Sequence, residues 1–164
     1  MPKRTSLSRS CGSCTACCGA LAVRELEKRA HTPCLFCNEG AGCRIYERRP
    51  DGCRQFCCEW LKGFGAEEDR PDKTGVVLDF VHGELGGVFQ MWEVREGSFR
   101  HPVVLRAARL ALQHGIPVMV SYASGTRAAF MTPPGYRLPE KIHWSDYEEA
   151  LGKIEVRPTH PAAL

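Results

Sequence analysis

Residues 11–18 read CGSCTACC, and this run of four cysteines decides how the rest of the chain is organised. The other six cysteines follow within residues 34–58, and residues 59–164 contain none. Cysteines that merely fill core space as small hydrophobes would be scattered over the whole chain. Thiols confined to one segment indicate a local construction instead, so the sequence predicts a cysteine-rich lobe near the N-terminus.

The spacing of these cysteines is that of metal ligands. Two intervening residues close a turn whose N–H groups point at sulfur, which lets both thiolates reach one ion. This C-x2-C unit occurs three times, as Cys11 with Cys14, Cys14 with Cys17, and Cys34 with Cys37. So many close thiols without a metal would be an oxidation liability, and the pattern therefore predicts metal binding.

The alternative use of clustered cysteines is a disulfide framework, which requires an oxidising compartment. Residues 1–10 are polar and basic and lack the apolar segment of a signal peptide. No apolar run of the sequence approaches the length of a membrane span. We therefore expect a cytoplasmic protein with no membrane partner, whose reduced thiols are available to metal ions.

Cys17 and Cys18 are adjacent, which bears on the number of metal centres. Neighbouring side chains in extended backbone point to opposite sides. Two adjacent thiolates are therefore more easily shared between two centres than given to one. Since a tetrahedral centre takes four ligands, ten cysteines leave room for a second one. The sequence favours two centres, or one polynuclear centre, over a single zinc ion.

The metal itself stays open between iron and zinc. C-x2-C-x2-C is the run that wraps an iron–sulfur cluster in bacterial ferredoxins, whereas zinc accepts four thiolates in closed tetrahedral sites. Either centre is anionic, and four arginines are placed to offset the charge or to donate hydrogen bonds to sulfur: Arg44, Arg48, Arg49 and Arg54. The alternative for these arginines is a solvated basic face. We expect an iron–sulfur cluster or another iron centre, with zinc as the alternative.

Four runs of the cysteine segment resemble the CxxCxxCC family, the YkgJ-type cysteine cluster proteins, which are described as zinc- or iron-chelating and often as iron–sulfur-cluster proteins. The runs are CGSCTACC at 11–18, TPCLFC at 32–37, CRIYERRP at 43–50 and CRQFCCEWL at 53–61. The RPDKTGVVL run at 70–78 extends the likeness beyond the cysteines. The resemblance implies nine metal ligands: Cys11, Cys14, Cys17, Cys18, Cys34, Cys37, Cys43, Cys53 and Cys58.

The resemblance also bears on the choice between Cys57 and Cys58. The family run C-R-x-F-x-C-x-W selects Cys58 and leaves Cys57 as the spare cysteine. Helix geometry by itself favours Cys57, which follows Cys53 by one turn on the same helix face. We follow the resemblance and predict Cys58 as the ligand.

The two parts of the chain differ in character. Residues 1–62 are predicted to form a metal-organised cysteine-rich lobe with a helix over 21–30 and another that starts at Pro50. Residues 63–164 are predicted to form an α+β portion that packs with the lobe as one compact unit, after a linker over 62–75. Its predicted elements are strands at 76–81, 88–94, 117–122 and 127–131 and helices at 102–114 and 146–153. This order predicts a small antiparallel sheet with helices on one face.

No reaction follows from these residues. The histidines are dispersed, and the sequence has no phosphate loop, dinucleotide fingerprint or nucleophile elbow. His31 lies close to Cys34 and is a candidate for an additional ligand. The sequence therefore favours a protein that is not an enzyme, and an enzyme that uses the cluster is an alternative.

The charge distribution limits the partners. The net charge is only +3, although residues 1–60 carry ten basic against six acidic side chains. The basic region has few interleaved aromatic residues, which argues against nucleic acid. We expect a metal-binding protein with a redox, metal-handling or accessory role and a protein redox or client partner. A structural zinc module that contacts protein or nucleic acid is the other alternative.

Overall fold

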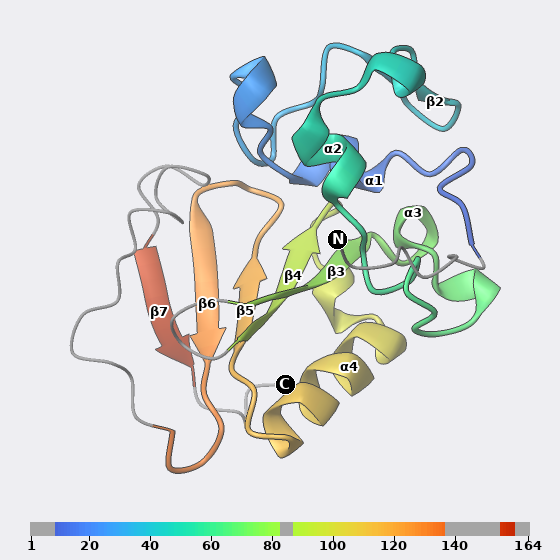
Figure 1. The fold of residues 1–164 in the computed structure, drawn as a ribbon. Coiled ribbons are helices and arrows are strands. Elements are labelled where there is room, and N and C mark those ends of the chain that lie inside the picture. The colour runs from blue at the N-terminus through green and yellow to red at the C-terminus, as the bar shows by residue number, and fades with distance from the viewer. Residues whose placement is uncertain (1–8, 83–86, 137–154, 160–164) are drawn as a thin grey trace.

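The computed structural model describes residues 9–82, 87–136 and 155–159, and it has α+β architecture (Figure 1). Five strands form one sheet in the order β3-β4-β5-β6-β7. The strands are β3 (Val76–Val81), β4 (Val88–Glu93), β5 (Val118–Ser121), β6 (Arg127–Met131) and β7 (Glu155–Thr159). Helix α4 (Pro102–Gln113) lies against the sheet, and residues 9–61, which we name the cysteine lobe, form a separate layer. Within the described residues, no helix is long and apolar enough to cross a membrane.

The sheet is mixed, which corrects the predicted antiparallel sheet. Strands β3 and β4 are antiparallel, as are β5 and β6, so both of these pairings agree with the prediction. Strands β4 and β5 are parallel, however, and so are β6 and β7. The reason lies in the connection from β4 to β5, which contains α4, because a crossover of this length lets the chain re-enter the sheet in the same direction.

Helix α4 confirms the helix predicted over 102–114, and its ends show why it forms there. Pro102 occupies the first position, where its missing N–H costs no hydrogen bond. Gly115 follows the helix with φ at 76°, a left-handed conformation that suits glycine. The N–H of Ile116 then donates to the Ala111 carbonyl at 2.9 Å and closes the last turn. The helix therefore stops where β5 must begin.

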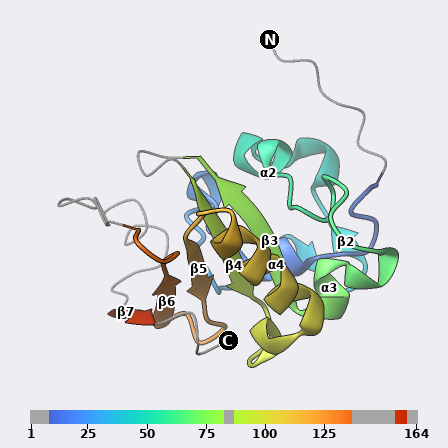
Figure 2. The same ribbon diagram turned by 90° about the horizontal axis from the view of Figure 1, so that it is seen from below.

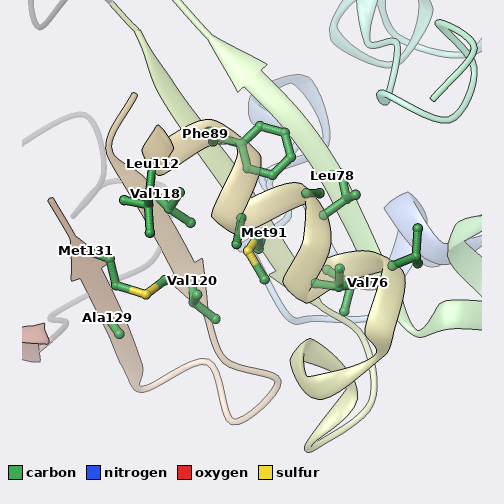
Figure 3. Packing of buried hydrophobic residues seen from close by; sticks show 14 residues of the cluster. Val76, Leu78, Phe89, Met91, Leu112, Val118, Val120, Ala129 and Met131 are labelled. Carbon is green, nitrogen blue, oxygen red and sulfur yellow. The ribbon is translucent and has the colours of Figure 1, made fainter. Parts of the chain in front are cut away.

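Both faces of the sheet are buried, and they face different layers. Alternate residues such as Leu78, Met91 and Val120 pack against α4 (Figure 3). The residues between them, such as Val77 and Trp92, pack against the cysteine lobe. A view from below shows α4 and the lobe on opposite sides of the strands (Figure 2). The predicted helical layer on one face is thus α4, while the lobe covers the other face.

The cysteine lobe contains only short elements. They are α1 (Ala16–Ala20), the 3-10 helix η1 (Arg24–Leu26), β1 (Cys37–Asn38), β2 (Gly42–Cys43), the 3-10 helix η2 (Tyr46–Arg48) and α2 (Asp51–Gln55). Between the lobe and the sheet lie η3 (Glu67–Asp69) and α3 (Pro71–Thr74), and η4 (Ser98–Arg100) precedes α4. The predicted linker over 62–75 therefore carries two short helices. The helix that begins after Pro50 is present but has five residues.

The helix predicted over 21–30 is wrong. Only η1 forms there, because Glu27 adopts a left-handed φ of 49° and breaks the helical path. Val23 and Lys28 pair instead as an antiparallel bridge, so the chain reverses direction. The reversal brings the N–H of His31 to the Ala20 carbonyl at 2.9 Å and returns the chain to the end of α1. The helix predicted over 146–153 lies outside the described residues.

Candidate metal centre

All ten cysteines lie in the described part of the chain, and all carry free thiols. They come from three segments of the lobe, at residues 11–18, 34–43 and 53–58. Hydrogen bonds between backbone groups close two of the three turns predicted from the C-x2-C spacing. The N–H of Cys14 donates to the Cys11 carbonyl at 2.9 Å, and that of Cys37 donates to the Cys34 carbonyl at 3.0 Å.

The second segment is held against the first. The N–H of Cys34 donates to the Cys18 carbonyl at 3.1 Å, which places the 34–37 turn beside α1. Cys37 and Cys43 are directly opposite each other in the antiparallel ribbon of β1 and β2. Residues in such a pair have their Cβ atoms about 4.5–5.5 Å apart on the same face of the ribbon. The ribbon therefore presents two thiols side by side.

Cys18 lies where these segments meet. Its thiol has hydrogen-bonding interactions with Cys17 and Cys37, and these interactions, together with the charge of Lys28, outweigh burial and lower the pKa of Cys18 to about 6. The same contact with Cys18, with burial added, raises the pKa of Cys17. Cys18 is therefore more acidic than an ordinary thiol, which favours its binding of a cation.

A second group of four thiols lies against the sheet. Cys58 is buried against the sheet, and the half-buried Cys11, Cys14 and Cys57 pack around the same apolar cluster. Burial raises the pKa of Cys58 to about 11, and the nearby thiols add to the effect. Cys17 interacts electrostatically with Cys11 and Cys14 as well as with Cys18, so it lies between the two groups.

Cys57 and Cys58 both belong to this second group, which also contains Cys11 and Cys14. Cys58 is buried, while Cys57 is half-buried and points its thiol toward the carbonyl of Cys58 at 3.9 Å. Burial is the main cause that raises the pKa of Cys57. The choice of Cys58 over Cys57 as ligand stays a prediction.

Among the described residues, the thiols are not gathered into a closed site. Across residues 9–82, 87–136 and 155–159, no three His, Cys, Asp or Glu side chains form a group that could hold a metal. The donor set nevertheless fits a thiophilic metal in kind, because it consists of reduced thiols that come together from three segments. The charge of the site also suits an anionic centre. Lys28 is buried, the charges of thiols act on its ammonium group, and it pairs with no described carboxylate.

The four arginines predicted to face the sulfur atoms mainly hold loops together. Arg44 donates to the carbonyl of Leu35. Arg49 donates to the Tyr46 carbonyl at 2.7 Å and lies over the Tyr46 ring at 3.8 Å. Arg54 donates to the carbonyls of Arg49 and Glu47 at 2.8 and 2.9 Å. The charge of Arg49 also acts on Cys11, whose pKa is raised mainly by burial and is lowered in part by this arginine. Arg48 is exposed.

His31, the candidate for an additional ligand, contacts the sheet in the structure. Its Nε2 lies 2.7 Å from the Ser121 hydroxyl on β5, and its ring also hydrogen-bonds the backbone of Glu93 on β4. The ring centroids of His31 and Trp92 are 6.1 Å apart. Burial lowers the pKa of His31, which favours the neutral ring. With its ring engaged by the sheet, His31 ties the segment before Cys34 to strands β4 and β5.

Sequence reasoning missed Lys28 and Arg9. In the sequence Lys28 is one of several polar residues of an expected helix, and only the reversal at Glu27 turns it inward. Arg9 donates to the carbonyls of Trp60, Phe64 and Gly65 at 2.9, 3.0 and 2.7 Å, and thereby fastens the start of the lobe to its end. No local pattern predicts either set of contacts. Arg9 reaches carbonyls more than 50 positions away, and Lys28 reaches those of Leu21 and Arg29 only because the chain reverses at Glu27.

Comparison with known proteins adds no assignment to this geometry. No protein-family model, curated protein or solved structure matches the chain. What the chain binds must therefore be argued from its own thiols, their spacing and their surroundings.

Proposed function

We propose that the protein binds metal through its cysteine lobe and holds an iron–sulfur cluster or another iron centre. The observation that carries the proposal is that the second cysteine segment is held against the first. The N–H of Cys34 donates to the Cys18 carbonyl at 3.1 Å, and Cys37 lies opposite Cys43 in the β1–β2 ribbon. Thiols from segments far apart in the sequence are thus brought together in a reduced state. The resemblance to the CxxCxxCC family supports the same assignment. The role that we propose is redox, metal-handling or accessory to a protein partner.

The proposed ligands are the nine cysteines of the family pattern: Cys11, Cys14, Cys17, Cys18, Cys34, Cys37, Cys43, Cys53 and Cys58. Iron is favoured by the C-x2-C-x2-C run, which is the typical wrapping of an iron–sulfur cluster. A bound cluster would supply one-electron redox chemistry. The chain itself supplies thiols at fixed positions, most of them half-buried, and the buried cation of Lys28.

Zinc is the second candidate, and the group of thiols near the sheet favours it. Cys58 is buried, and the thiol of Cys14 receives N–H groups of Ala16 and Asp72, which lower its otherwise burial-raised pKa. Shielded thiolates that accept backbone N–H groups are typical of closed structural zinc sites. With zinc the lobe would be a structural module that presents its surface to a protein partner.

One purification experiment tests both candidates. Protein prepared without oxygen is analysed for iron, zinc and acid-labile sulfide, and its visible absorption is recorded before and after reduction. Iron and sulfide in similar amounts, with colour that bleaches on reduction, support the cluster. Stoichiometric zinc in colourless protein supports the alternative. Folded, fully reduced protein that contains neither metal contradicts the proposal.

The same analysis of three variants tests the ligands. Cys17→Ser and Cys43→Ser should each lower the bound metal and destabilise the lobe, because ligand binding is part of its folding free energy. Cys57→Ser is the matched control and should keep the metal content of the unmodified chain, because Cys57 is the spare cysteine. Unchanged metal in both ligand variants would remove Cys17 and Cys43 from the ligand set.

A further inference from the structure

Lys28 is a buried lysine with no acidic partner among the described residues. Its residue is only 9% exposed. The ammonium group donates to the carbonyl of Leu21 and to that of Arg29, the latter at 3.2 Å. An ammonium group has three N–H donors, and within the described residues these two carbonyls account for two of them, which leaves one donor for a sulfur atom. Within the described part of the chain, no carboxylate forms an ion pair with Lys28.

The ammonium group lies at the end of α1, the helix that carries Cys17 and Cys18. It donates to the carbonyl of Leu21, whose own N–H donates to the Cys17 carbonyl at 3.0 Å. Burial lowers the pKa of Lys28, and the charges of Cys34, Cys18, Cys17 and Cys53, in this order, act against that effect. The interaction is mutual, because the charge of Lys28 helps to lower the pKa of Cys18. The position of Lys28 follows from the reversal of the chain. Its backbone pairs with Val23, and its ammonium group reaches the carbonyl of Leu21 directly after α1.

A buried cation needs an anion close by. Removing a single charge from water costs several kcal/mol in a real protein, and only a paired charge recovers that cost. The acidic groups around Lys28 are the four thiols. A site with four thiolates and one divalent metal keeps a net charge of −2, which is the charge that a neighbouring ammonium group can offset. The buried lysine is therefore accounted for if the thiols next to it belong to an anionic centre.

We propose that Lys28 is the internal counter-ion of the metal centre and donates its unused N–H to a sulfur atom of that centre. This inference rests on the proposed function. Lys28 is a positioning residue, because it acts through the thiols and the carbonyls of Leu21 and Arg29 hold it in place. It thereby favours an anionic thiolate centre on the side of α1 that carries Cys18.

The test compares Lys28→Met, which keeps the length of the side chain but removes its charge, with Lys28→Arg, which keeps the charge. Zn²⁺ is the probe, and its affinity is measured anaerobically by competition with a chromophoric chelator. Lys28→Met should weaken Zn²⁺ binding about 10- to 100-fold, the usual loss when an outer partner of a metal ligand is removed. Lys28→Arg should stay much closer to the unmodified chain.

Two further measurements separate this role from packing. Lys73→Met is the matched control, because Lys73 is exposed and also donates to a carbonyl, that of Glu67 at 3.2 Å. It should leave Zn²⁺ affinity unchanged. In protein isolated with iron, Lys28→Met should lower the reduction potential, because a nearby positive charge favours the more negative reduced state.

The outcomes distinguish the two proposals. If the unmodified chain and Lys28→Met bind Zn²⁺ equally tightly, the counter-ion role is wrong while metal binding stands. This is the result that packing alone predicts, since methionine fills similar space. If the unmodified chain binds neither Zn²⁺ nor iron, the proposed function fails, and the counter-ion role fails with it.

Discussion

The sheet and the cysteine lobe are stabilised in different ways. The sheet and α4 enclose a continuous apolar core in which Met91, Ala108 and Val118 are 0% exposed. The lobe has helices of five residues and strands of two, and its buried residues are few: Ala16, Ala20, Lys28, Cys58, Trp60 and Leu61. Helices this short are not stable alone in water. The comparison shows that burial of apolar surface accounts for the sheet but not for the lobe.

The lobe relies on polar contacts instead. Arginine side chains such as Arg9 and Arg54 donate to backbone carbonyls and join loops that lack a core. Each such bond contributes only about 0.5–1.5 kcal/mol, somewhat more when the donor is charged. A metal bound by several thiolates contributes far more than any one of them, because its binding free energy becomes folding free energy. The proposed metal would therefore be the main support of the lobe.

Removal of the metal should have the largest effect, and it should destabilise the lobe but not the sheet. When the metal is at 100 times its dissociation constant, binding adds about 2.7 kcal/mol to stability. A chelator should therefore speed amide hydrogen exchange in residues 9–61 about 100-fold, as measured by mass spectrometry, and leave β3–β5 unchanged. Equal protection of the lobe with and without metal would show that it has another source of stability.

Thiol reactivity in metal-free protein should show the next largest effect. At pH 7 Cys18, with its pKa lowered to about 6, is mostly thiolate, whereas Cys58, with its pKa raised to about 11, is a thiol. Iodoacetamide should thus modify Cys18 at least about 100-fold faster than Cys58, since only thiolates react. Mass spectrometry of peptides measures both rates. Equal rates would mean that the lobe has lost its structure without metal, which would sharpen the contrast with the sheet.

These two pKa shifts also give opposite dependences of stability on pH. The pKa of Cys18 is below its ordinary 9.0, so the contact between Cys17 and Cys18 stabilises the fold most near pH 9, and this contribution is lost as pH falls through about 6. The same contact raises the pKa of Cys17, so the contribution also declines as pH rises above 9. The pKa of Cys58 is above 9.0, so its contribution is present below pH 9 and is lost as pH rises through about 11.

The smallest expected effect concerns the link between the two regions. Ser121→Ala removes the hydroxyl that bonds His31 at 2.7 Å and should cost about 1 kcal/mol of unfolding free energy. In a His31→Phe background the same change should cost much less, because the bond is already absent. Urea unfolding of the four proteins measures the difference. Ser124→Ala, at an exposed serine, is the control. If the free-energy costs of Ser121→Ala and His31→Phe simply add in the double variant, the hydrogen bond between His31 and Ser121 contributes nothing to stability.

Local signals in the sequence were sufficient for the sheet portion. The strand predicted over 76–81 is β3 with identical bounds, because β-branched residues and flanking glycines mark it clearly. The direction of β5 was predicted wrongly even though the helix that determines it was predicted correctly. Strand pairing is a long-range property, and the crossover through α4 had to be combined with the strand order to reveal it.

The structure of the lobe could be predicted less well from local sequence signals. The spacing of Cys11, Cys14, Cys34 and Cys37 predicted the two closed turns, because that geometry is local. The contact between Cys18 and Cys37 and the burial of Lys28 depend on the reversal at Glu27, where tertiary contacts override helical propensity. A short amphipathic pattern cannot reveal that the chain must return to α1.

The burial of both faces of the sheet has a consequence for solubility. The lobe covers Val77, Val88, Trp92, Met119 and Phe130, which form a contiguous apolar surface on the strands. If the lobe detached, this surface would meet water while the core under α4 stayed intact. Exposed apolar patches of this kind drive aggregation. A shortage of the proposed metal would thus first cause otherwise folded molecules to precipitate.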